Sequence, residues 1–306
     1  MSANISIKAE KISRKYGDKV ALNDILFEVG KGELFGFIGP DGAGKTTLFR
    51  ILTTLLIPDS GSISIEGLNP VKDYVKLRKI LGYMPGKFSL YQDLTVEENL
   101  RFFAGIFNTT PEANYELVKE IYSQIEPFKN RKAGKLSGGM KQKLALSCAL
   151  IHRPEVLILD EPTTGVDAVS RSEFWEMLAR LRQSGITIVV STPYMDEASR
   201  CDRVALIQNG SIMSIDTPGA IRKNFGRSLW SVHTDNIYGL LHDLRQFKAT
   251  RTAFLFGESI HLSLSDEGVK PAEIASYLQA SGHTNVQIKQ IEPSTEDSFM
   301  EMMKKE

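Results

Sequence analysis

The chain has 306 residues, of which 42% are hydrophobic and 24% are charged, which suits a globular protein with one large domain or a large and a small one. Lys plus Arg and Asp plus Glu each number 37, so the formal net charge is zero and gives no electrostatic footprint for nucleic acid. Cys148 and Cys201 match no metal or disulfide spacing, and no apolar stretch is long enough to cross a bilayer. We therefore expect a protein of a reducing compartment that reaches a membrane only through a partner and has no nucleic-acid partner.

The first predicted elements are strands. Ile5–Ser13 alternates between apolar and polar residues, and Val20–Val29 reads as a second strand pair after a turn around Gly17. Tyr16 lies roughly twenty residues before a glycine-rich loop, where an exposed ring is a candidate to stack on adenine. The alternative is a tyrosine that ends a strand and packs on its own turn.

A short apolar run, Leu34–Ile38, leads into a loop with the pattern G-x-x-x-x-G-K-[ST], which is typical of a phosphate-binding loop. Its glycines allow backbone N–H groups to turn inward around a phosphate, because no Cβ obstructs the approach. Lys45 would reach the β- and γ-phosphates, Thr46 would offer its hydroxyl to Mg²⁺, and a helix over Thr47–Leu55 would point its N-terminus at the anion. The alternative is a glycine-rich turn without a ligand. The predicted nucleotide-binding residues of this loop are Gly39, Pro40, Asp41, Gly42, Ala43, Gly44, Lys45, Thr46 and Thr47.

After this loop the pattern changes from strands to helices. Thr95, with Glu98 three residues on, has the spacing of a capping box, which predicts the start of a helix. From Glu97 to Gly134 we expect helical structure throughout, within a helical subdomain of about residues 95–152 inserted into an α/β core. The separate segments are predicted as strands at Ser62–Ile65 and Leu81–Met84 and as helices at 95–107 and Pro111–Ile125.

A second glycine-rich helix start follows at Ser137, Gly138 and Gly139, and the residues KQKLALSCALI soon after it have helical spacing. A serine and two glycines leave N–H groups unpaired and unobstructed, which makes this a candidate second anion site. On the local residues alone, a plain N-cap is the alternative. The position of this segment shortly before a buried strand favours the binding role.

That strand is the apolar run Val156–Leu159, and two carboxylates follow it. Asp160 stands where a Mg²⁺ ion beside a phosphate loop needs a ligand. Glu161 is placed as a general base that polarises a water molecule toward the γ-phosphate. The alternative, a pair of solvated turn carboxylates, is disfavoured because the preceding residues are apolar.

The remaining chain is predicted to complete the α/β core and to change character near Pro218. The core continues with Asp167 in a tight loop, a helix at Ser172–Ser184, a strand at Ile186–Ser191, a short helix at Met195–Cys201, and a hairpin of Val204–Ile207 with Gly210–Ile215. Later strands are expected at Leu229–His233, Ala253–Phe256, Ile260–Leu264 and Val286–Ile291, and helices at Tyr238–Phe247, Pro271–Ala280 and Thr295–Lys304. We interpret this part as a small α+β appendage whose histidines lie at no metal spacing.

In combination these motifs resemble the ATP-binding cassette (ABC) ATPases. GPDGAGKTT resembles their Walker A loop, LSGGMKQ their signature, LILDEP their Walker B strand, and Thr164–Asp167 their D-loop, over about residues 5–220. LYQDLTVEENL and the tail IEPSTEDSFMEMM further resemble ATPase subunits of bacterial drug-efflux and polysaccharide-type ABC exporters. The resemblance implies an α/β P-loop NTPase cassette over residues 1–217, with a parallel-sheet core, an antiparallel β subdomain and the helical insertion. Residues 218–306 would form a small C-terminal α+β accessory domain.

The resemblance also implies a mechanism. One chain carries a phosphate loop and a signature that cannot both reach one nucleotide, so two cassettes would sandwich ATP head to tail between one Walker A loop and the partner's Ser137–Gly139. ATP and Mg²⁺ are the implied ligands, with Lys45 and Glu161 as catalytic residues and Thr46 and Asp160 holding the metal. Closure and opening would drive an integral-membrane permease. The expected location is the cytoplasm, at the inner face of the membrane through that permease.

Two positions depart from the family pattern. Gly86 stands where the family usually has a glutamine, and Pro193 stands where it usually has a histidine that contacts the γ-phosphate. Glycine supplies no side chain and proline donates no hydrogen bond, so this site would bind ATP but hydrolyse it slowly. The chain would then complete a competent site on a different subunit. Neutral loop drift is one alternative, and replacement by a neighbouring Gln92, Tyr194 or Lys87 is another.

Two further functions compete with an exporter subunit. One is a soluble cassette protein that acts on ribosomes or DNA, although such relatives usually carry two cassettes in one chain or a long coiled coil, and neither is visible here. The other is a non-hydrolysing ATP-dependent clamp or regulator, which Gly86 and Pro193 would favour.

Overall fold

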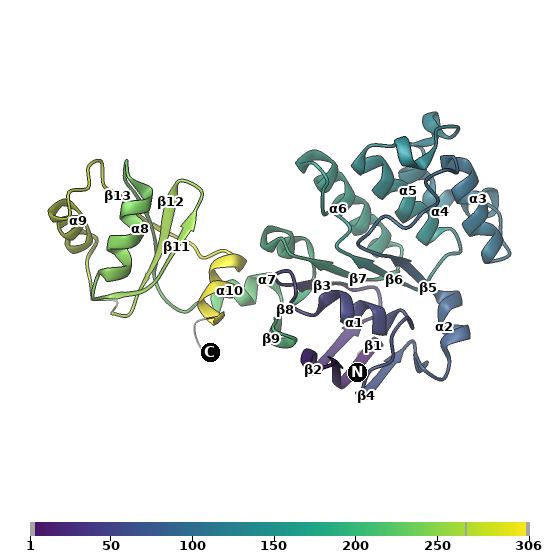
Figure 1. Cartoon of the computed structure of the whole chain (residues 1–306), viewed down its shortest axis with the longest axis horizontal. Helices are drawn as coiled ribbons and strands as arrows, with labels where there is room; N and C mark the ends of the chain where they lie inside the picture. Colours follow the sequence, from purple (N-terminus) through teal and green to yellow (C-terminus); the bar gives the residue numbers. More distant parts are fainter. Residues whose placement is uncertain (1–3, 267, 304–306) are drawn as a thin grey trace. The chain divides into compact units, whose positions relative to one another are not determined.

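The computed structural model describes residues 4–266 and 268–303 (Figure 1). The chain folds into two compact units, one that ends at Pro218 and one that begins at Gly219. They are called the amino-terminal and carboxyl-terminal units below, and each is described by itself.

The amino-terminal unit is built on a mainly parallel sheet with the strand order β5-β6-β7-β3-β8-β9. Its strands pair in parallel from β5 to β8, and β9 closes the edge antiparallel to β8. Every residue of β3, β6 and β7 is buried, as expected for strands covered on both faces. The strands are β3 (Leu34–Ile38), β5 (Leu81–Met84), β6 (Val156–Asp160), β7 (Thr187–Thr192), β8 (Arg203–Gln208) and β9 (Ser211–Asp216).

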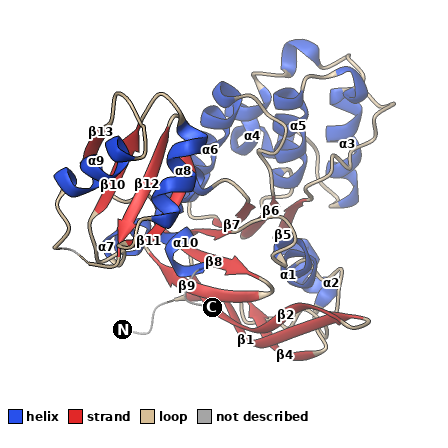
Figure 2. Cartoon of the chain, turned by 60° about the vertical axis from the view of Figure 1, so that its left-hand side comes forward, coloured by secondary structure: helices blue, strands red, loops and turns tan. Residues whose placement is uncertain are grey.

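A second, antiparallel sheet with the order β2-β1-β4 faces the first (Figure 2). Its strands are β1 (Ile5–Tyr16), β2 (Lys19–Gly30) and β4 (Ser60–Ile65). Helix α1 (Lys45–Leu52) lies between the two sheets, and its Phe49 ring packs edge-on against Phe37 of β3. One apolar core therefore holds both sheets and the helix that follows the glycine-rich loop.

Helices cover the other side of the parallel sheet and form the insertion. The helical insertion contains α3 (Val96–Ile106), α4 (Tyr115–Tyr122) and α5 (Gly138–Leu150), with short 3₁₀ turns at Glu112–Asn114, Glu126–Phe128 and Ala133–Lys135. The expected capping box is confirmed, because the Thr95 hydroxyl accepts from the Glu98 N–H and the Glu98 carboxylate accepts from the Thr95 N–H. The expectation of helix throughout Glu97–Gly134 is wrong, because left-handed Asn108 ends the first helix and turns separate the rest.

Other helix boundaries differ from the sequence expectation by a few residues. Helix α1 begins at Lys45 rather than Thr47, and α6 (Ala168–Gln183) begins four residues early because the Asp167 carboxylate caps it by accepting from the Ser170 N–H. The remaining helical elements are α2 (Tyr74–Ile80), the 3₁₀ helix Met195–Arg200 and α7 (Pro218–Lys223).

The carboxyl-terminal unit has a β-α-β-β-α-β sequence with the sheet order β11-β12-β10-β13 and antiparallel pairing, which is the ferredoxin-like arrangement. Its helices α8 and α9 contact one face of the sheet, and α10 reaches the other through the pair His261–Asp297. The predicted tail residue Lys304 lies outside the described residues. The elements are β10 (Leu229–His233), α8 (Ile237–Gln246), β11 (Thr250–Phe256), β12 (Ser259–Leu264), α9 (Pro271–Ala280), β13 (Gln287–Ile291) and α10 (Thr295–Met303).

Candidate nucleotide site

The glycine-rich loop joins the buried end of β3 to the start of α1. Gly44 is the N-cap of α1 with a left-handed backbone (φ +104°), and no side chain caps the helix there. The first N–H groups of the helix are therefore not satisfied by a capping side chain. Together with the helix dipole, they make this end of α1 suited to an anion.

At two positions of the loop, glycine is required for a reason that the motif alone does not reveal. A Cβ at Gly39 would collide with the carbonyl oxygen of Ile207 on β8, and a Cβ at Gly44 would lie 2.5 Å from the carbonyl oxygen of Ala21 on β2. These positions need glycine because neighbouring strands press on the loop, in addition to any approach of phosphate.

Lys45 is buried and contacts three oxygen atoms. Its Nζ donates to the carbonyl oxygens of Gly39 (2.7 Å) and Pro40 (3.0 Å) and lies 3.2 Å from Oε1 of Glu161. The ammonium therefore sits inside the loop, beside the expected general base. A phosphate bound in the loop would meet a cation that the fold already holds in place.

The two carboxylates at the end of β6 differ in exposure. Asp160 is 2% exposed, and its Oδ1 accepts from the Ser191 hydroxyl at 2.6 Å. The Glu161 side chain is 22% exposed, and its backbone is left-handed (φ +48°). The Asp160 carboxylate is thus buried at the end of β6 and held by Ser191, whereas the partly exposed Glu161 side chain points toward the Lys45 ammonium.

These residues fit Mg²⁺ by the chemistry of their donors. Asp160 supplies a carboxylate at the carboxyl end of a buried strand, and Thr46 supplies a hydroxyl in the first turn of α1. Magnesium is commonly bound by one or two carboxylates and retains water and substrate phosphate as further ligands. One carboxylate and one hydroxyl are therefore enough protein ligands.

A pocket of about 220 Å³ opens over the loop. Tyr16 borders it and is 43% exposed, with the Arg14 guanidinium 5.3 Å from its ring centre. The pocket thus joins the candidate adenine partner to the phosphate loop and to the candidate base. Its lining residues are Tyr16, Lys19, Ala21, Gly42, Gly44, Lys45, Thr46, Thr47 and Glu161.

The signature residues lie elsewhere. Ser137 caps α5 by accepting from the Met140 N–H, and none of Ser137, Gly138 and Gly139 is among the described residues that line the loop pocket. A Cβ at Gly139 would stand 2.8 Å from the Ser170 hydroxyl oxygen, so the Ser170 side chain would have to shift. Gly138 is exposed and Ser137 is held only at the helix cap, so a second molecule can approach this helix start.

Gly86 lies beside Asp160, and Pro193 comes two residues after Ser191, which pairs with Asp160. A Cβ at Gly86 would stand 3.1 Å from the carbonyl oxygen of Asp160, and Pro193 directly follows β7, which pairs with β6. None of the three neighbours considered as replacements is among the described residues that line the loop pocket. The backbone carbonyl oxygen of Gln92 accepts from the Gly134 N–H, and the Tyr194 ring lies under the Arg171 guanidinium at 4.7 Å. Lys87 is exposed.

Sequence reasoning missed a buried carboxylate next to this site. Glu197 is 3% exposed and accepts hydrogen bonds from the hydroxyls of Thr163 and Thr192, with the Arg171 guanidinium 3.7 Å away. The contacts join the segment after Glu161, the end of β7 and the start of α6. An acidic residue in a short polar helix gave no signal of burial.

The fold and the site define a P-loop nucleoside triphosphatase: a parallel sheet, a glycine-rich loop at the start of α1, and an acidic residue at the end of a neighbouring strand. Residues 22–164 match the family described as ABC transporter. The chain is 32% identical over 309 residues to Nod factor export ATP-binding protein I of Rhizobium sp. (strain N33), across 99% of both chains. The chain therefore belongs to the ABC transporter ATP-binding proteins, the family of ATPases whose fold and ATP-binding function were expected from its motifs.

A second relative is more similar but longer. The probable multidrug ABC transporter ATP-binding protein YbhF of Escherichia coli (strain K12) is 40% identical over 291 residues. The match covers 94% of this chain and 50% of YbhF, so the chain spans half the length of that relative.

Solved structures agree with the cassette fold. Clostridium perfringens cbiO1, described as part of the ABC transporter complex cbiONQ, superposes with a TM-score of 0.64 at 29% identity and covers 72% of this chain and 94% of cbiO1. The ATP-binding cassette MJ0796, solved as a dimer bound to ADP and Pi, gives a TM-score of 0.62 at 25% identity over 69% of this chain and 98% of that one. The expected α/β cassette is confirmed.

Proposed function

We propose that this chain is the ATP-hydrolysing subunit of a membrane exporter and that ATP closes two cassettes head to tail. The observation that carries the proposal is the separation of the two anion-binding helix starts. Lys45 and Thr46 line one pocket, whereas Ser137 and Gly138 lie outside it. A nucleotide bound at one loop can meet a signature only from another molecule, and the relative MJ0796 cassette was solved as a dimer.

In this proposal each site residue has a separate task. The loop N–H groups and Lys45 hold the phosphates, Tyr16 stacks on adenine, and Glu161 accepts a proton from the attacking water. Thr46 and Asp160 hold Mg²⁺, which would neutralise phosphate charge when bound. Residues 1–217 are the ATP-binding domain, and residues 218–306 are an accessory domain.

Lys45→Ala tests the nucleotide site directly. The change removes the cation that the loop holds against Glu161, so ATP affinity should fall by about 10–100-fold. Calorimetric titration of the purified chain measures it. Lys11→Ala, an exposed lysine on β1, is the control. Unchanged affinity in Lys45→Ala would refute the proposed site.

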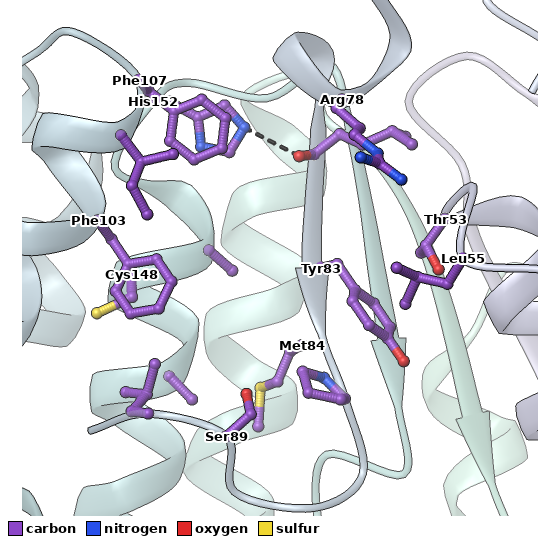
Figure 3. Close-up of a pocket in the computed structure, with 16 residues that line it drawn as sticks. Thr53, Leu55, Arg78, Tyr83, Met84, Ser89, Phe103, Phe107, Cys148 and His152 are labelled. Carbon is purple, nitrogen blue, oxygen red and sulfur yellow. Dashed lines mark hydrogen bonds between the residues drawn. The ribbon is translucent and has the colours of Figure 1, made fainter. Parts of the chain in front are cut away.

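The permease would dock in a second cavity, an apolar groove of about 330 Å³ (Figure 3). One wall carries Tyr83 and Met84 of β5, and the other carries Phe103 of α3 and Cys148 of α5. Burial, aided by the Asp160 charge, raises the pKa of Tyr83 to about 12, so the groove keeps a neutral phenol. Burial lowers the pKa of His152 at the other end.

The groove suits a short apolar segment of an integral-membrane protein. It is bordered by Ile106, which is 56% exposed, and by Leu55, which is 59% exposed. Strand β5 leads from this groove to Gly86, which stands beside Asp160. Movement of a docked segment would therefore reach the carboxylates through one short strand. We place the chain at the inner face of the membrane through this contact; no helix among its described residues meets the length and hydropathy of a membrane span.

Matched charge substitutions test the docking. Ile106→Asp places a carboxylate in the groove, and Leu26→Asp makes the same change on β2 at a similar exposure of 59%. We expect only Ile106→Asp to lose the membrane protein that co-purifies from solubilised membranes. Loss in both variants or in neither would refute the groove as the docking site. Absence of any membrane protein with the wild-type chain would favour the soluble cassette function instead.

A hydrolysis-impaired site in a heterodimer is the second candidate, favoured by Gly86 and Pro193. Removing a donor that stabilises developing charge typically costs about 10²–10³ in rate, so restoring donors with Gly86→Gln and Pro193→His should raise the rate by about tenfold or more. The purified wild-type chain alone should turn over slowly. The glutamine needs a small shift of the backbone at Asp160. Wild-type turnover near the typical enzyme value of about ten per second would refute this candidate.

Glu161→Gln separates hydrolysis from clamping. The amide keeps the size of the side chain but cannot accept the proton from water. Turnover should fall while ATP affinity remains. An unchanged rate would mean that Glu161 is not the base, and no measurable rate in either form would favour the non-hydrolysing regulator.

A further inference from the structure

We propose that Ser191 is a positioning residue that holds both Asp160 and Glu161 in their working arrangement. This inference rests on the proposed ATPase function and names a side chain that the motifs do not include. Ser191 lies on β7, directly opposite Asp160 of β6 in the parallel register, and is fully buried.

One hydroxyl serves both carboxylate residues. Its oxygen donates to Oδ1 of Asp160 at 2.6 Å and accepts from the N–H of Glu161 at 2.9 Å. The Glu161 N–H also approaches the Ser191 carbonyl oxygen at 3.1 Å. Ser191 therefore fixes the rotation of one carboxylate and the backbone of the next residue from a single position.

The contact to Glu161 has a particular importance because of its backbone. Glu161 has φ +48°, a left-handed conformation that residues other than glycine adopt only at an energetic cost. Such a conformation persists only when surrounding contacts determine it. The hydrogen bonds from its N–H to Ser191 supply that determination, and they direct the Glu161 side chain toward Lys45.

Ser191 matters more in this chain because the residues at two nearby positions, Gly86 and Pro193, offer no side-chain hydrogen bond to the carboxylates. Gly86 stands beside Asp160 without a side chain, and Pro193 cannot donate a hydrogen bond. Among the described residues, the side chains placed in hydrogen bonds or ion pairs with Asp160 and Glu161 are those of Ser191 and Lys45. Lys45 acts on Glu161, so orientation of the Asp160 carboxylate depends on Ser191.

The inference predicts a specific defect in the metal-dependent part of nucleotide binding. Removing a group that orients a metal ligand typically costs about 10–100-fold in metal affinity. Ser191→Ala should therefore reduce the gain in affinity that Mg²⁺ gives to a non-hydrolysable ATP analogue by about tenfold. Affinity in EDTA should stay within about twofold of wild type, because the phosphate loop is untouched. Ser191→Thr, which keeps the hydroxyl, should restore the gain.

The experiment is isothermal titration of the full chain with adenylyl imidodiphosphate, with Mg²⁺ and with EDTA. Ser147→Ala is the control, because Ser147 is also fully buried and its hydroxyl donates to the carbonyl oxygen of Lys143 within α5. An unchanged Mg²⁺ gain in Ser191→Ala, an equal loss in Ser147→Ala, or failure of Ser191→Thr to restore the gain would overturn the inference. Lys45→Ala measured in parallel keeps the two proposals distinct: if it leaves EDTA affinity unchanged, the nucleotide site itself is wrong.

Discussion

Tyr16 is the residue of the site whose role depends least on the phosphate motif. It ends β1, borders the pocket over the loop, and has the Arg14 guanidinium near its ring. Its sequence position suggested a role in adenine stacking, and that role stays a prediction. Lys45 and Asp160 could be proposed as site residues from the sequence because their motifs are local, and their roles also stay predictions. Ser191 and Glu197 could not be proposed in this way, because their hydrogen bonds cross between strands and loops that are distant in the sequence.

Tyr16→Ala should weaken ATP binding by about tenfold, because loss of base stacking typically costs about 1–3 kcal/mol per base. Tyr16→Phe should bind as the wild type does, since stacking needs the ring and not the hydroxyl. Inorganic triphosphate, which has no base, should bind equally to all three proteins. Competition titrations measure each affinity. A loss of triphosphate binding in Tyr16→Ala would show that the residue supports the loop instead.

At the scale of elements, the buried carboxylate of Glu197 holds the segment after β7 in place. The Glu197 carboxylate accepts hydrogen bonds from the hydroxyls of Thr163 and Thr192 and lies near Arg171. Arg171 also pairs with Asp196 at 3.0 Å. These contacts therefore connect the segment after Glu161 to the first turn of α6.

Glu197→Ala should lower the free energy of unfolding by about 1–3 kcal/mol, because it leaves the buried hydroxyls of Thr163 and Thr192 without their acceptor. Glu197→Gln should cost less, since an amide oxygen still accepts from a hydroxyl. Urea unfolding measures both, and Glu176→Ala on α6 serves as the control. Equal stability of all variants would contradict a stabilising role for Glu197. The sequence could not reveal this residue, because burial of an acid depends on three segments that meet only in the fold.

Two buried acidic residues attach α10 to its sheet: Asp297 pairs with His261, and Glu301 pairs with Arg251. Burial acts to raise the pKa of Asp297, but hydrogen bonds from His261 and Ser294 outweigh it, and the net pKa is lowered. A lowered carboxyl pKa stabilises the fold above the unfolded value of about 3.9. That contribution is lost as the pH falls through the folded pKa.

The carboxyl-terminal unit should therefore lose stability as the pH falls from about 5 to about 3, and Asp297→Asn should flatten this dependence. Trp230 of β10 reports on this unit once Trp175 of α6 is replaced by phenylalanine. Urea titrations followed by tryptophan fluorescence at a series of pH values measure the effect. The same pH slope in the Asp297→Asn protein would contradict the assignment of this dependence to Asp297.

At the scale of the whole molecule, the order of strands and helices in the core followed from the sequence because each buried strand contains a continuous apolar run. The strand order did not follow, because periodicity does not say which strands become neighbours. In the carboxyl-terminal unit, most of the predicted segments exist, and Pro271–Ala280 has the predicted bounds. Its ferredoxin-like pairing emerged only from the structure.

From the division into two units we predict that the amino-terminal unit binds the nucleotide without the carboxyl-terminal unit. Every residue that lines the loop pocket precedes Pro218, and the core between the two sheets draws all its members from the same unit. A chain that ends at Pro218 should fold and keep its ATP affinity within about twofold.

At a ligand concentration of about 100 times the dissociation constant, binding adds about 2.7 kcal/mol to the stability of the folded state. The truncated and full-length proteins should therefore show similar rises in melting temperature with ATP, and Lys45→Ala in the truncated chain should make the rise at the same ATP concentration clearly smaller. A truncated protein that is folded by circular dichroism but shows no shift would mean that residues after Pro218 take part in nucleotide binding.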